Sequence, residues 1–390
     1  MSTPTAKRWP AIERQRVCVL PGDGIGVEVT DAVLPLFDAL RLPIDLHLAD
    51  IGWRCWCRDG DAVPAATWAS IEAADATLLG AITSQPLHAA EAQLPKHLQG
   101  QARPYVSPVI QLRQRLGLYA NVRPITDILG EQRFRFTVIR ENTEGLYAGL
   151  DFASIPAALE PLLQARERTG AAWQREGADD ACVALRLQTR SGLQRLFRFA
   201  FEHARQEQLG RVTLADKANV LRHSGAFGKA IFEAVASDYP DIVAQIDNVD
   251  AVALWMIRRP ERFGVVVAEN MFGDILSDLG AGVMGGLGLA PSANIGAAAA
   301  YFEPVHGSAP GHVGRGTANP SAMFLSVALL LEHLGHAAEA QALQQAVTHV
   351  ARYVCQTPDL GGSATTAHVA AAIIQHCLAL PVPSRARSAP

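Results

Sequence analysis

Short apolar runs alternate along this chain with longer segments that have the periodicity of helices. An apolar run over residues 16–20 ends in a glycine turn at 21–26, and a helical pattern follows over 27–40. Strand, glycine turn and helix in this order open an α/β unit, and the alternation continues along the chain. The pattern therefore predicts an α/β fold with a largely parallel sheet. The other predicted strands are 75–82, 136–139, 212–214 and 263–268, and the other predicted helices are 192–208, 225–239 and 321–334.

Two segments depart from this alternation. Residues 154–180 are polar and rich in Glu and Arg, so they are predicted to form an excursion on the surface. Residues 381–390 are low in apolar side chains and are predicted to be a disordered tail.

The composition narrows the class of protein. With 390 residues, of which 49% are hydrophobic, the chain can form one large domain or two medium ones. A net charge of −4 argues against a nucleic-acid partner, and no apolar run is long enough to cross a membrane. The N-terminus lacks the hydrophobic segment of a signal peptide, and the six cysteines are scattered, which argues against a disulfide framework. We therefore expect a cytoplasmic enzyme without a membrane partner.

Two glycine-containing loops are candidates for contact with a ligand. Gly22, Gly24 and Gly26 lack the spacing of a dinucleotide-binding fingerprint, so the spacing favours a tight turn between strand and helix. The loop at 306–314 also contains glycines, which let the backbone approach a phosphate or a ribose closely. Neither loop alone identifies a nucleotide site.

Asp274 and Asp278 are four residues apart in an apolar run. If the run is helical, this spacing stacks both carboxylates on one face, where they repel each other unless a cation compensates them. Two oxygen ligands on a rigid element suit Mg²⁺ or Mn²⁺. The alternative is an N-terminal helical turn, where the helix dipole favours acids.

Several basic residues are candidates for binding acidic groups. Arg113, Arg123 and Arg140 suit forked recognition of carboxylates, with structural ion pairs as the alternative. Lys217 and Asp250 are each predicted to end a strand. A lysine beside acids and a bound metal can be tuned towards general-base catalysis.

Six longer motifs give the chain a resemblance to a known family. From about Val17 to about Ala372 it resembles the isocitrate and isopropylmalate dehydrogenases, which are metal-dependent β-decarboxylating dehydrogenases of 2-hydroxy acids. The motifs are LPGDGIG at 20–26, LYANVRP at 118–124, RENTEG at 140–145, GDILSD at 273–278, GGLGLAPSANIG at 285–296 and EPVHGSAP at 303–310.

The resemblance implies catalytic and metal-binding roles for five residues. Asp274 and Asp278 would bind Mg²⁺ or Mn²⁺ from one subunit, and Asp250 would reach the same ion from the other subunit. Lys217, also from the other subunit, would serve as the base for the 2-hydroxyl or relay to it. Tyr147 would protonate the enolate after CO₂ leaves.

The resemblance also implies which residues bind the substrate and the dinucleotide. The arginines would bind the substrate carboxylates in a site formed by Ser107, Arg113, Arg123, Arg140, Asn219 and Val220. The dinucleotide would be bound by Ser84, Glu303, His306, Gly307, Ala318 and Asn319.

The fold implied by the resemblance has two domains and forms a homodimer with shared active sites. A large dinucleotide-binding domain would comprise residues 1–105 and 265–380, and a smaller substrate and dimerisation domain would comprise 106–264.

The substrate is expected to be a 3-substituted malate, and the segment around Ser107 should read its variable group. Val109 stands where isocitrate-type enzymes have an asparagine, and with Ile110 it would suit isopropylmalate. Isopropylmalate enzymes, however, usually lack the motif at 140–145. The segment 106–124 is most similar to homoisocitrate dehydrogenases, so the resemblance favours oxidation of homoisocitrate to 2-oxoadipate. Isopropylmalate and isocitrate are the alternatives.

The dinucleotide loop departs from the family pattern. NAD-dependent members usually have an acid directly after the motif at 303–310, and NADP-dependent members have Lys-Tyr, whereas this chain has Gly311 and His312. The surrounding sequence favours NAD, with NADP not excluded. A non-catalytic regulatory subunit on the same fold is an alternative of another class, although this chain keeps the metal, base and acid residues.

Overall fold

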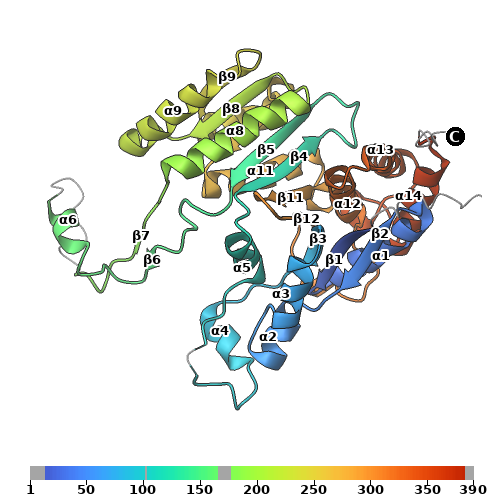
Figure 1. The fold of residues 1–390 in the computed structure, drawn as a ribbon, viewed down its shortest axis with the longest axis horizontal. Coiled ribbons are helices and arrows are strands. Elements are labelled where there is room, and N and C mark those ends of the chain that lie inside the picture. The colour runs from blue at the N-terminus through green and yellow to red at the C-terminus, as the bar shows by residue number, and fades with distance from the viewer. Residues whose placement is uncertain (1–13, 102, 166–176, 383–390) are drawn as a thin grey trace, which may run out of the picture. The chain divides into compact units, whose positions relative to one another are not determined.

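A computed structural model describes residues 14–101, 103–165 and 177–382. The chain divides into two compact units (Figure 1). The first unit comprises the described parts of Met1–Leu112, Gly285–Ala293 and Ala298–Pro390, and the second comprises Arg113–Met284 and Asn294–Ala297. Residues 265–284 thus group with the second unit, and the predicted division into domains stays a prediction. Residues 383–390 of the predicted disordered tail and residues 166–176 of the predicted surface excursion lie outside the described residues.

The first unit is built on parallel strands that come from both ends of the chain. They neighbour one another in the order β2, β1, β3, β12, followed by the first residues of β11. The pairs β1–β2, β1–β3 and β3–β12 are all parallel. The strands are β1 (Gln15–Gly22), β2 (Ile44–Leu48), β3 (Ala76–Ala81), β11 (Pro291–Ile295) and β12 (Ala300–Pro304).

Helices from the two ends of the chain pack together in the first unit. Helix α1 contacts β3 and α14, and α12 contacts both β12 and α13 (Figure 1). This arrangement is dictated by apolar faces, since the inward residues of α1, such as Val29, Val33 and Leu36, are fully buried. The helices are α1 (Ile25–Leu40), α12 (Ser321–His333), α13 (Ala337–Tyr353) and α14 (Thr366–Ala379).

The second unit contains five strands of the same ten-stranded sheet, together with its own helices. Its strands follow the order β4, β5, β10, β8, β9, and all pairs are parallel except β4–β5. Helices α8 and α9 pack on each other through Phe197, Phe201 and Phe232, whose rings meet at 5.3–5.4 Å between centroids. The elements are β4 (Ala120–Thr126), β5 (Arg135–Glu141), α8 (Arg190–Gln206), β8 (Arg211–Asp216), α9 (Arg222–Ala236), β9 (Val243–Asn248), α10 (Val249–Arg258), β10 (Val265–Ala268) and α11 (Asn270–Met284).

The remaining described elements are short. They are α2 (Trp53–Asp59), α3 (Ala65–Glu72), α4 (Leu87–Ala92), α5 (Pro108–Arg115), β6 (Asp151–Phe152), α6 (Glu160–Gln164), β7 (Val183–Ala184) and four 3-10 turns, η1 (Pro260–Arg262), η2 (Leu287–Leu289), η3 (Pro310–His312) and η4 (Pro358–Leu360).

The predicted fold class is confirmed: the structure is α/β with a largely parallel sheet. Every predicted strand and helix is present, with ends that differ by a few residues. The strand predicted from residue 263 begins at Val265, and Gly264 before it packs so closely that an added Cβ would meet Leu209 O at 2.4 Å. Helix α8 begins at Arg190, because Thr189 caps it by accepting a hydrogen bond from the Gly192 N–H.

The glycine turn is a packing feature, as its spacing predicted. Gly24 has a φ of 60°, and a Cβ on it would lie 2.0 Å from Ser308 O. Ser308 O accepts a hydrogen bond from the Ile25 N–H at 2.9 Å. The glycine turn and the loop at 306–314, which neither identified a site alone, therefore pack directly against each other.

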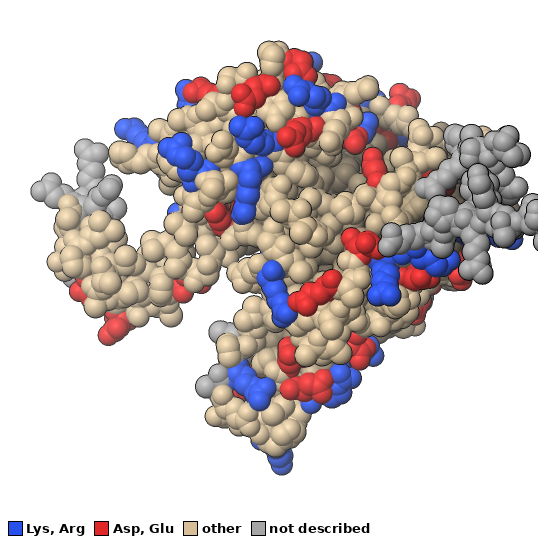
Figure 2. Space-filling model, in the orientation of Figure 1, with Lys and Arg blue, Asp and Glu red and all other residues tan. Residues whose placement is uncertain are grey.

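The surface carries charges of both signs. On the face drawn in Figure 2, Lys and Arg side chains lie among Asp and Glu side chains. Within the part of the chain that the structure describes, no helix is both long enough and apolar enough to span a membrane.

Candidate active site

The two aspartates lie one turn apart in the interior of α11. The helix begins at Asn270 and has no acid in its first turn, so the alternative explanation by the helix dipole does not hold. Glu269, directly before the helix, instead accepts a hydrogen bond from the Phe272 N–H at 3.1 Å. Asp274 and Asp278 therefore share one face of a rigid helix, as their spacing predicted.

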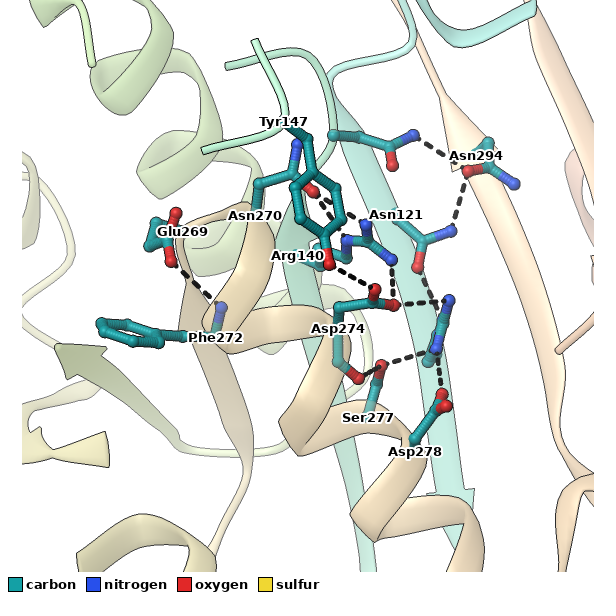
Figure 3. A network of polar contacts seen from close by, with 12 residues as sticks. Asn121, Arg140, Tyr147, Glu269, Asn270, Phe272, Asp274, Ser277, Asp278 and Asn294 are labelled. Atoms are coloured by element: carbon teal, nitrogen blue, oxygen red, sulfur yellow. Dashed lines mark hydrogen bonds and ion pairs between the residues drawn. The ribbon is translucent and has the colours of Figure 1, made fainter. Parts of the chain in front are cut away.

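Two arginines from neighbouring strands compensate the charges of these aspartates (Figure 3). Arg140, on β5, forms an ion pair with Asp274 Oδ1. Arg123, on β4, donates from Nη1 to Asp278 Oδ1 at 2.8 Å and lies 3.6 Å from Asp274 Oδ1. The predicted need for a compensating cation is thus met within the chain by guanidinium groups.

The arginines form a cluster that can bind an anion. Arg140 is only 2% exposed, and its pKa is lowered to about 10 by burial and by repulsion from the nearby charges of Arg113 and Arg123. The charges of Arg113 and Arg123 both lower this pKa, while the charge of Asp274 raises it. A ligand with carboxylate groups would relieve the repulsion among the arginines.

Tyr147 lies beside both Asp274 and Arg140 (Figure 3). Its hydroxyl donates to Asp274 Oδ2 at 3.2 Å, and the Arg140 guanidinium lies 5.3 Å from the centre of its ring. Burial and the negative charge of Asp274 raise the pKa of Tyr147. The phenol therefore keeps its proton at neutral pH and can act as a proton donor.

A row of buried amides orients the arginines, and sequence analysis assigned it no role. Arg123 Nε donates to Asn121 Oδ1 at 2.8 Å, and Asn121 Nδ2 donates to Asn294 Oδ1 at 2.8 Å. Asn142 Nδ2 donates to the same Asn294 oxygen at 3.0 Å. The sequence did contain one signal for this row: an asparagine inside an apolar strand. A buried amide is nearly always hydrogen-bonded, so such an asparagine indicates a buried polar partner.

Arg140 is oriented in the same way. Asn270 Oδ1 accepts hydrogen bonds from its Nε at 3.0 Å and its Nη2 at 2.8 Å. Asn270 Nδ2 in turn donates to the Glu144 carbonyl at 2.8 Å. Both arginines therefore have their planar groups held before any substrate arrives.

Lys217 and Asp250 form an ion pair of 2.5 Å with each other. Lys217 directly follows β8, as predicted. The prediction that Asp250 ends a strand was wrong, because β9 stops at Asn248 and Asp250 lies in the first turn of α10, where the dipole favours an acid. The hydrogen bond from Lys217 lowers the pKa of Asp250. Among the described residues, no three His, Cys, Asp or Glu side chains converge on one metal position.

Asn219 and Val220 follow Lys217 and are exposed, with Val220 at 66%. Ser84 and Ser107 come together in the first unit, where their hydroxyls are 3.0 Å apart. Close by, Thr83 Oγ1 donates to Ser308 Oγ at 2.6 Å. Ser107, predicted to contact the substrate, and Ser84, predicted to contact the dinucleotide, are therefore neighbours.

His306 offers an unused acceptor in the predicted dinucleotide site. Its Nδ1 is 3.0 Å from the Gly307 carbonyl, which can only accept, so Nδ1 carries the proton. Burial lowers the pKa of His306, and its Nε2 is buried without a hydrogen-bond partner among the described residues. This nitrogen suits a ligand hydroxyl or amino group. The backbone at Gly307 is open, with no atom within 4 Å of an added Cβ.

The other predicted dinucleotide residues already hold structural contacts. Asn319 donates to Asp359 Oδ2 at 3.1 Å, and the Ala318 N–H donates to Glu28 Oε1 at 3.2 Å. Glu303, which is 9% exposed, accepts a hydrogen bond from the Tyr301 hydroxyl at 3.0 Å. Each of these three residues is therefore held in place by a hydrogen bond within the chain.

Comparisons with known proteins agree on one family. A family model described as isocitrate/isopropylmalate dehydrogenase matches residues 16–373. Protein DlpA of Legionella pneumophila is 55% identical over 369 residues, which are 94% of this chain but only 59% of DlpA. A 3-isopropylmalate dehydrogenase of Methanothermobacter thermautotrophicus and a homoisocitrate dehydrogenase of Methanocaldococcus jannaschii are each 38% identical, over 94% and 93% of this chain and 99% and 97% of their own lengths.

The crystal structure of an isocitrate dehydrogenase from Methylococcus capsulatus matches with a TM-score of 0.78 at 34% identity. The match covers 93% of this chain and 99% of that one. Fold, family model and relatives therefore agree over nearly the whole chain. This protein belongs to the isocitrate/isopropylmalate dehydrogenase family of β-decarboxylating dehydrogenases.

Proposed function

We propose that this protein catalyses the metal-dependent oxidative decarboxylation of a 3-substituted malate, with hydride transfer to NAD⁺. The observation that carries the proposal is the pairing of Asp274 and Asp278 with the oriented guanidinium groups of Arg123 and Arg140. Carboxylate oxygens suit a hard divalent ion, and the fork of an arginine suits the substrate carboxylates.

Asp274 and Asp278 would hold Mg²⁺ or Mn²⁺ together with Asp250 from a second copy of the chain. Two carboxylates on one helix face fit such an ion as a partial ligand set. When bound, the ion lowers the pKa of the substrate hydroxyl and stabilises negative charge on that oxygen. Lys217 from the second copy would accept the hydroxyl proton. Tyr147, whose phenol is protonated, would supply a proton to the carbon that loses CO₂.

NAD⁺ is the proposed cofactor, bound by Ser84, Glu303, His306, Gly307, Ala318 and Asn319. The unused Nε2 of His306 supports this assignment, because a dinucleotide presents ribose hydroxyls and an adenine amino group as donors. Gly311 and His312 are exposed, and neither is an acid that would repel a 2′-phosphate, so NADP⁺ is the alternative cofactor.

Homoisocitrate, converted to 2-oxoadipate, is the proposed substrate. Ser107 is half-buried beside Ser84, whereas Ile110 is 43% exposed and leaves room for a long substituent. The relatives carry names of both isopropylmalate and homoisocitrate enzymes, so isopropylmalate and isocitrate are the competing substrates. Differences of one or two pocket residues change such preferences by ~1–3 kcal/mol.

A homodimer is proposed because α10 and α11 expose apolar side chains. Leu254, Ile257 and Ile275 are 52%, 61% and 60% exposed. Ile257 also lines a cavity of about 980 Å³ that reaches Asp278. Large apolar side chains exposed on neighbouring helices are typical of a surface that another chain covers.

The test is reduced-nucleotide formation with Mn²⁺ across homoisocitrate, isocitrate, isopropylmalate, tartrate and malate, each with NAD⁺ and NADP⁺. We expect turnover with homoisocitrate and NAD⁺ to exceed the others in kcat/KM. A strong preference for another acid would change the assigned substrate but would still support the proposed reaction. Complete inactivity of the folded, dimeric protein would favour a non-catalytic subunit instead.

A further inference from the structure

A small cavity lies in the second unit, and none of the residues that line it has been assigned to the reaction. Its volume is about 10 Å³, which is about the minimum that holds one water molecule. The apolar part of its lining comes from α8 and β8, including Leu193, Phe197 and Leu214. The polar part comes from four side chains: Arg186, Gln188, Asp216 and Glu269.

Arg186 and Asp216 form a buried ion pair at this cavity. Arg186 Nη1 and Nη2 donate to Asp216 Oδ1 at 3.3 and 3.2 Å, and both side chains are nearly buried. The guanidinium also donates to Gln188 Oε1, at 2.8 Å from Nη2, and lies 5.6 Å from the centre of the Phe272 ring. Asp216 directly precedes Lys217, so this pair anchors the strand end that carries the proposed base.

Glu269, the residue directly before α11, lines the same cavity. It is 4% exposed, and its Oε1 caps α11 by accepting from the Phe272 N–H. Its Oε2 is buried and has no hydrogen-bond partner among the described residues. A buried carboxylate oxygen without a donor is strongly unfavourable, and water is the usual partner where the protein supplies none.

We propose that this cavity binds one ordered water molecule, which donates to Glu269 Oε2 and joins it to the Arg186–Asp216 pair. A water with two to four polar partners is a stable part of a fold, and this lining supplies them. The water would tie the first turn of α11, which leads to Asp274, to the end of β8, which leads to Lys217. The proposal concerns the fold of one chain and does not depend on which substrate the protein oxidises.

Gly228 allows a test, because the proposal predicts whether a substitution there raises or lowers Tm. It lies inside α9, is buried, and lines the cavity, and the nearest atom to an added Cβ is Leu193 Cδ1 at 4.0 Å. A glycine-to-alanine change inside a helix normally stabilises it. Here the new methyl group would displace the water and leave Glu269 Oε2 without a partner, so we expect Gly228→Ala to lower Tm.

The matched control is the same substitution in a Glu269→Ala background. That background keeps the change in helix propensity but removes the acceptor, so Gly228→Ala should raise Tm there. An increase in Tm in both backgrounds would overturn the proposal. A high-resolution crystal structure of the unsubstituted protein gives the second measurement: we expect density for one water within hydrogen-bond distance of Glu269 Oε2, and a cavity without density would also overturn it.

Discussion

Asp274 contacts two arginines and a tyrosine, and it is also a proposed ligand of the metal. Its two carboxylate oxygens contact different partners, because Oδ1 pairs with Arg140 and Oδ2 accepts from Tyr147. A neutral amide of the same shape would keep the packing and lose the charge. A substitution at this position therefore separates the effect of the charge on catalysis from the effect of the side chain on packing.

Replacing Asp274 by Asn should lower kcat at saturating Mn²⁺ by at least about 100-fold, because one charged metal ligand is lost. The steady-state assay of reduced nucleotide measures this effect, and circular dichroism checks that the fold is kept. Asp238→Asn is the control, since Asp238 is an exposed partner of Arg198 on the surface. Unchanged turnover of Asp274→Asn would remove Asp274 from the metal site.

Tyr147→Phe tests the proton donor without moving its neighbours. Because the phenol is 46% exposed, we expect stability to change by less than about 1 kcal/mol. The loss of a positioned acid should lower kcat by about 10²–10⁴-fold and change the substrate KM much less. Measured kcat and KM at several pH values decide the point, and a kcat close to that of the unsubstituted enzyme would assign the proton to another donor.

Asn294→Ala tests the row of amides behind Arg123. The substitution removes the acceptor shared by Asn121 and Asn142, which should cost about 1–3 kcal/mol of stability at this fully buried site. With Asn121 released, Arg123 loses its fixed orientation, so the substrate KM should rise. Asn248→Ala, at an exposed position, is the control. A variant that loses stability but keeps its KM would show that the amides serve the fold alone.

At the scale of single residues, the sequence predicted the charged members of the site better than their partners. The four-residue spacing of Asp274 and Asp278 predicted their shared helix face. No spacing rule links Arg123 to Asn294, because a hydrogen-bonded chain through Asn121 joins residues that are distant in the sequence. Contacts of this kind follow from the pairing of strands and not from local pattern.

At the scale of secondary-structure elements, hydrophobic periodicity located the strands and helices, and close packing set their ends. Strand β10 begins two residues later than predicted, after Gly264, whose close approach to the backbone of Leu209 and Arg211 periodicity cannot show. The position of Asp250 was predicted wrongly: the pattern placed a strand end there, whereas β9 stops at Asn248 and α10 follows without a loop.

The contact between α8 and β5 should make stability depend on pH. His203 on α8 lies 3.2 Å from Thr137 Oγ1, and burial, with repulsion from Arg135, lowers its pKa to about 4. The unfolded chain, with a histidine pKa of about 6.5, therefore binds more protons between about pH 4 and 6.5. Stability is full above this window and falls as the pH decreases through it.

His203→Gln should reduce this loss of stability by about 2 kcal/mol between pH 7 and 4, allowing for the partial exposure of the ring. Urea unfolding at both pH values measures the difference, with His368→Gln, at an exposed position, as the control. If both variants lose as much stability as the unsubstituted protein, His203 is not responsible for the pH dependence.

At the scale of the whole molecule, the proposed reaction requires two chains for each site. The structure of one chain pairs Lys217 with Asp250, and among the described residues no third acid joins Asp274 and Asp278 at one metal position. If Lys217 serves the site of a second copy, the inactive variants Asp274→Asn and Lys217→Ala should complement each other when mixed and refolded. Random pairing gives half mixed dimers with one complete site each, or about a quarter of the original activity.

This complementation is measured as turnover after mixing, against each variant refolded alone. Size-exclusion chromatography with light scattering confirms that dimers form. Mixed dimers without activity would show that Lys217 and Asp274 act within one chain. The sequence could not predict this arrangement from its own pattern, because no periodicity records which residues meet across a subunit boundary.

The contact between Gly24 and Ser308 joins distant parts of the chain, so it also bears on the order in which the two units fold during synthesis. The sheet of the first unit needs β1 and β3 from the start of the chain and β12 from near its end. The second unit is almost continuous in sequence and can fold while the ribosome is still at work. The N-terminal strands must wait for about two hundred more residues, so their apolar edges are exposed to chaperones and to neighbouring nascent chains for much of translation.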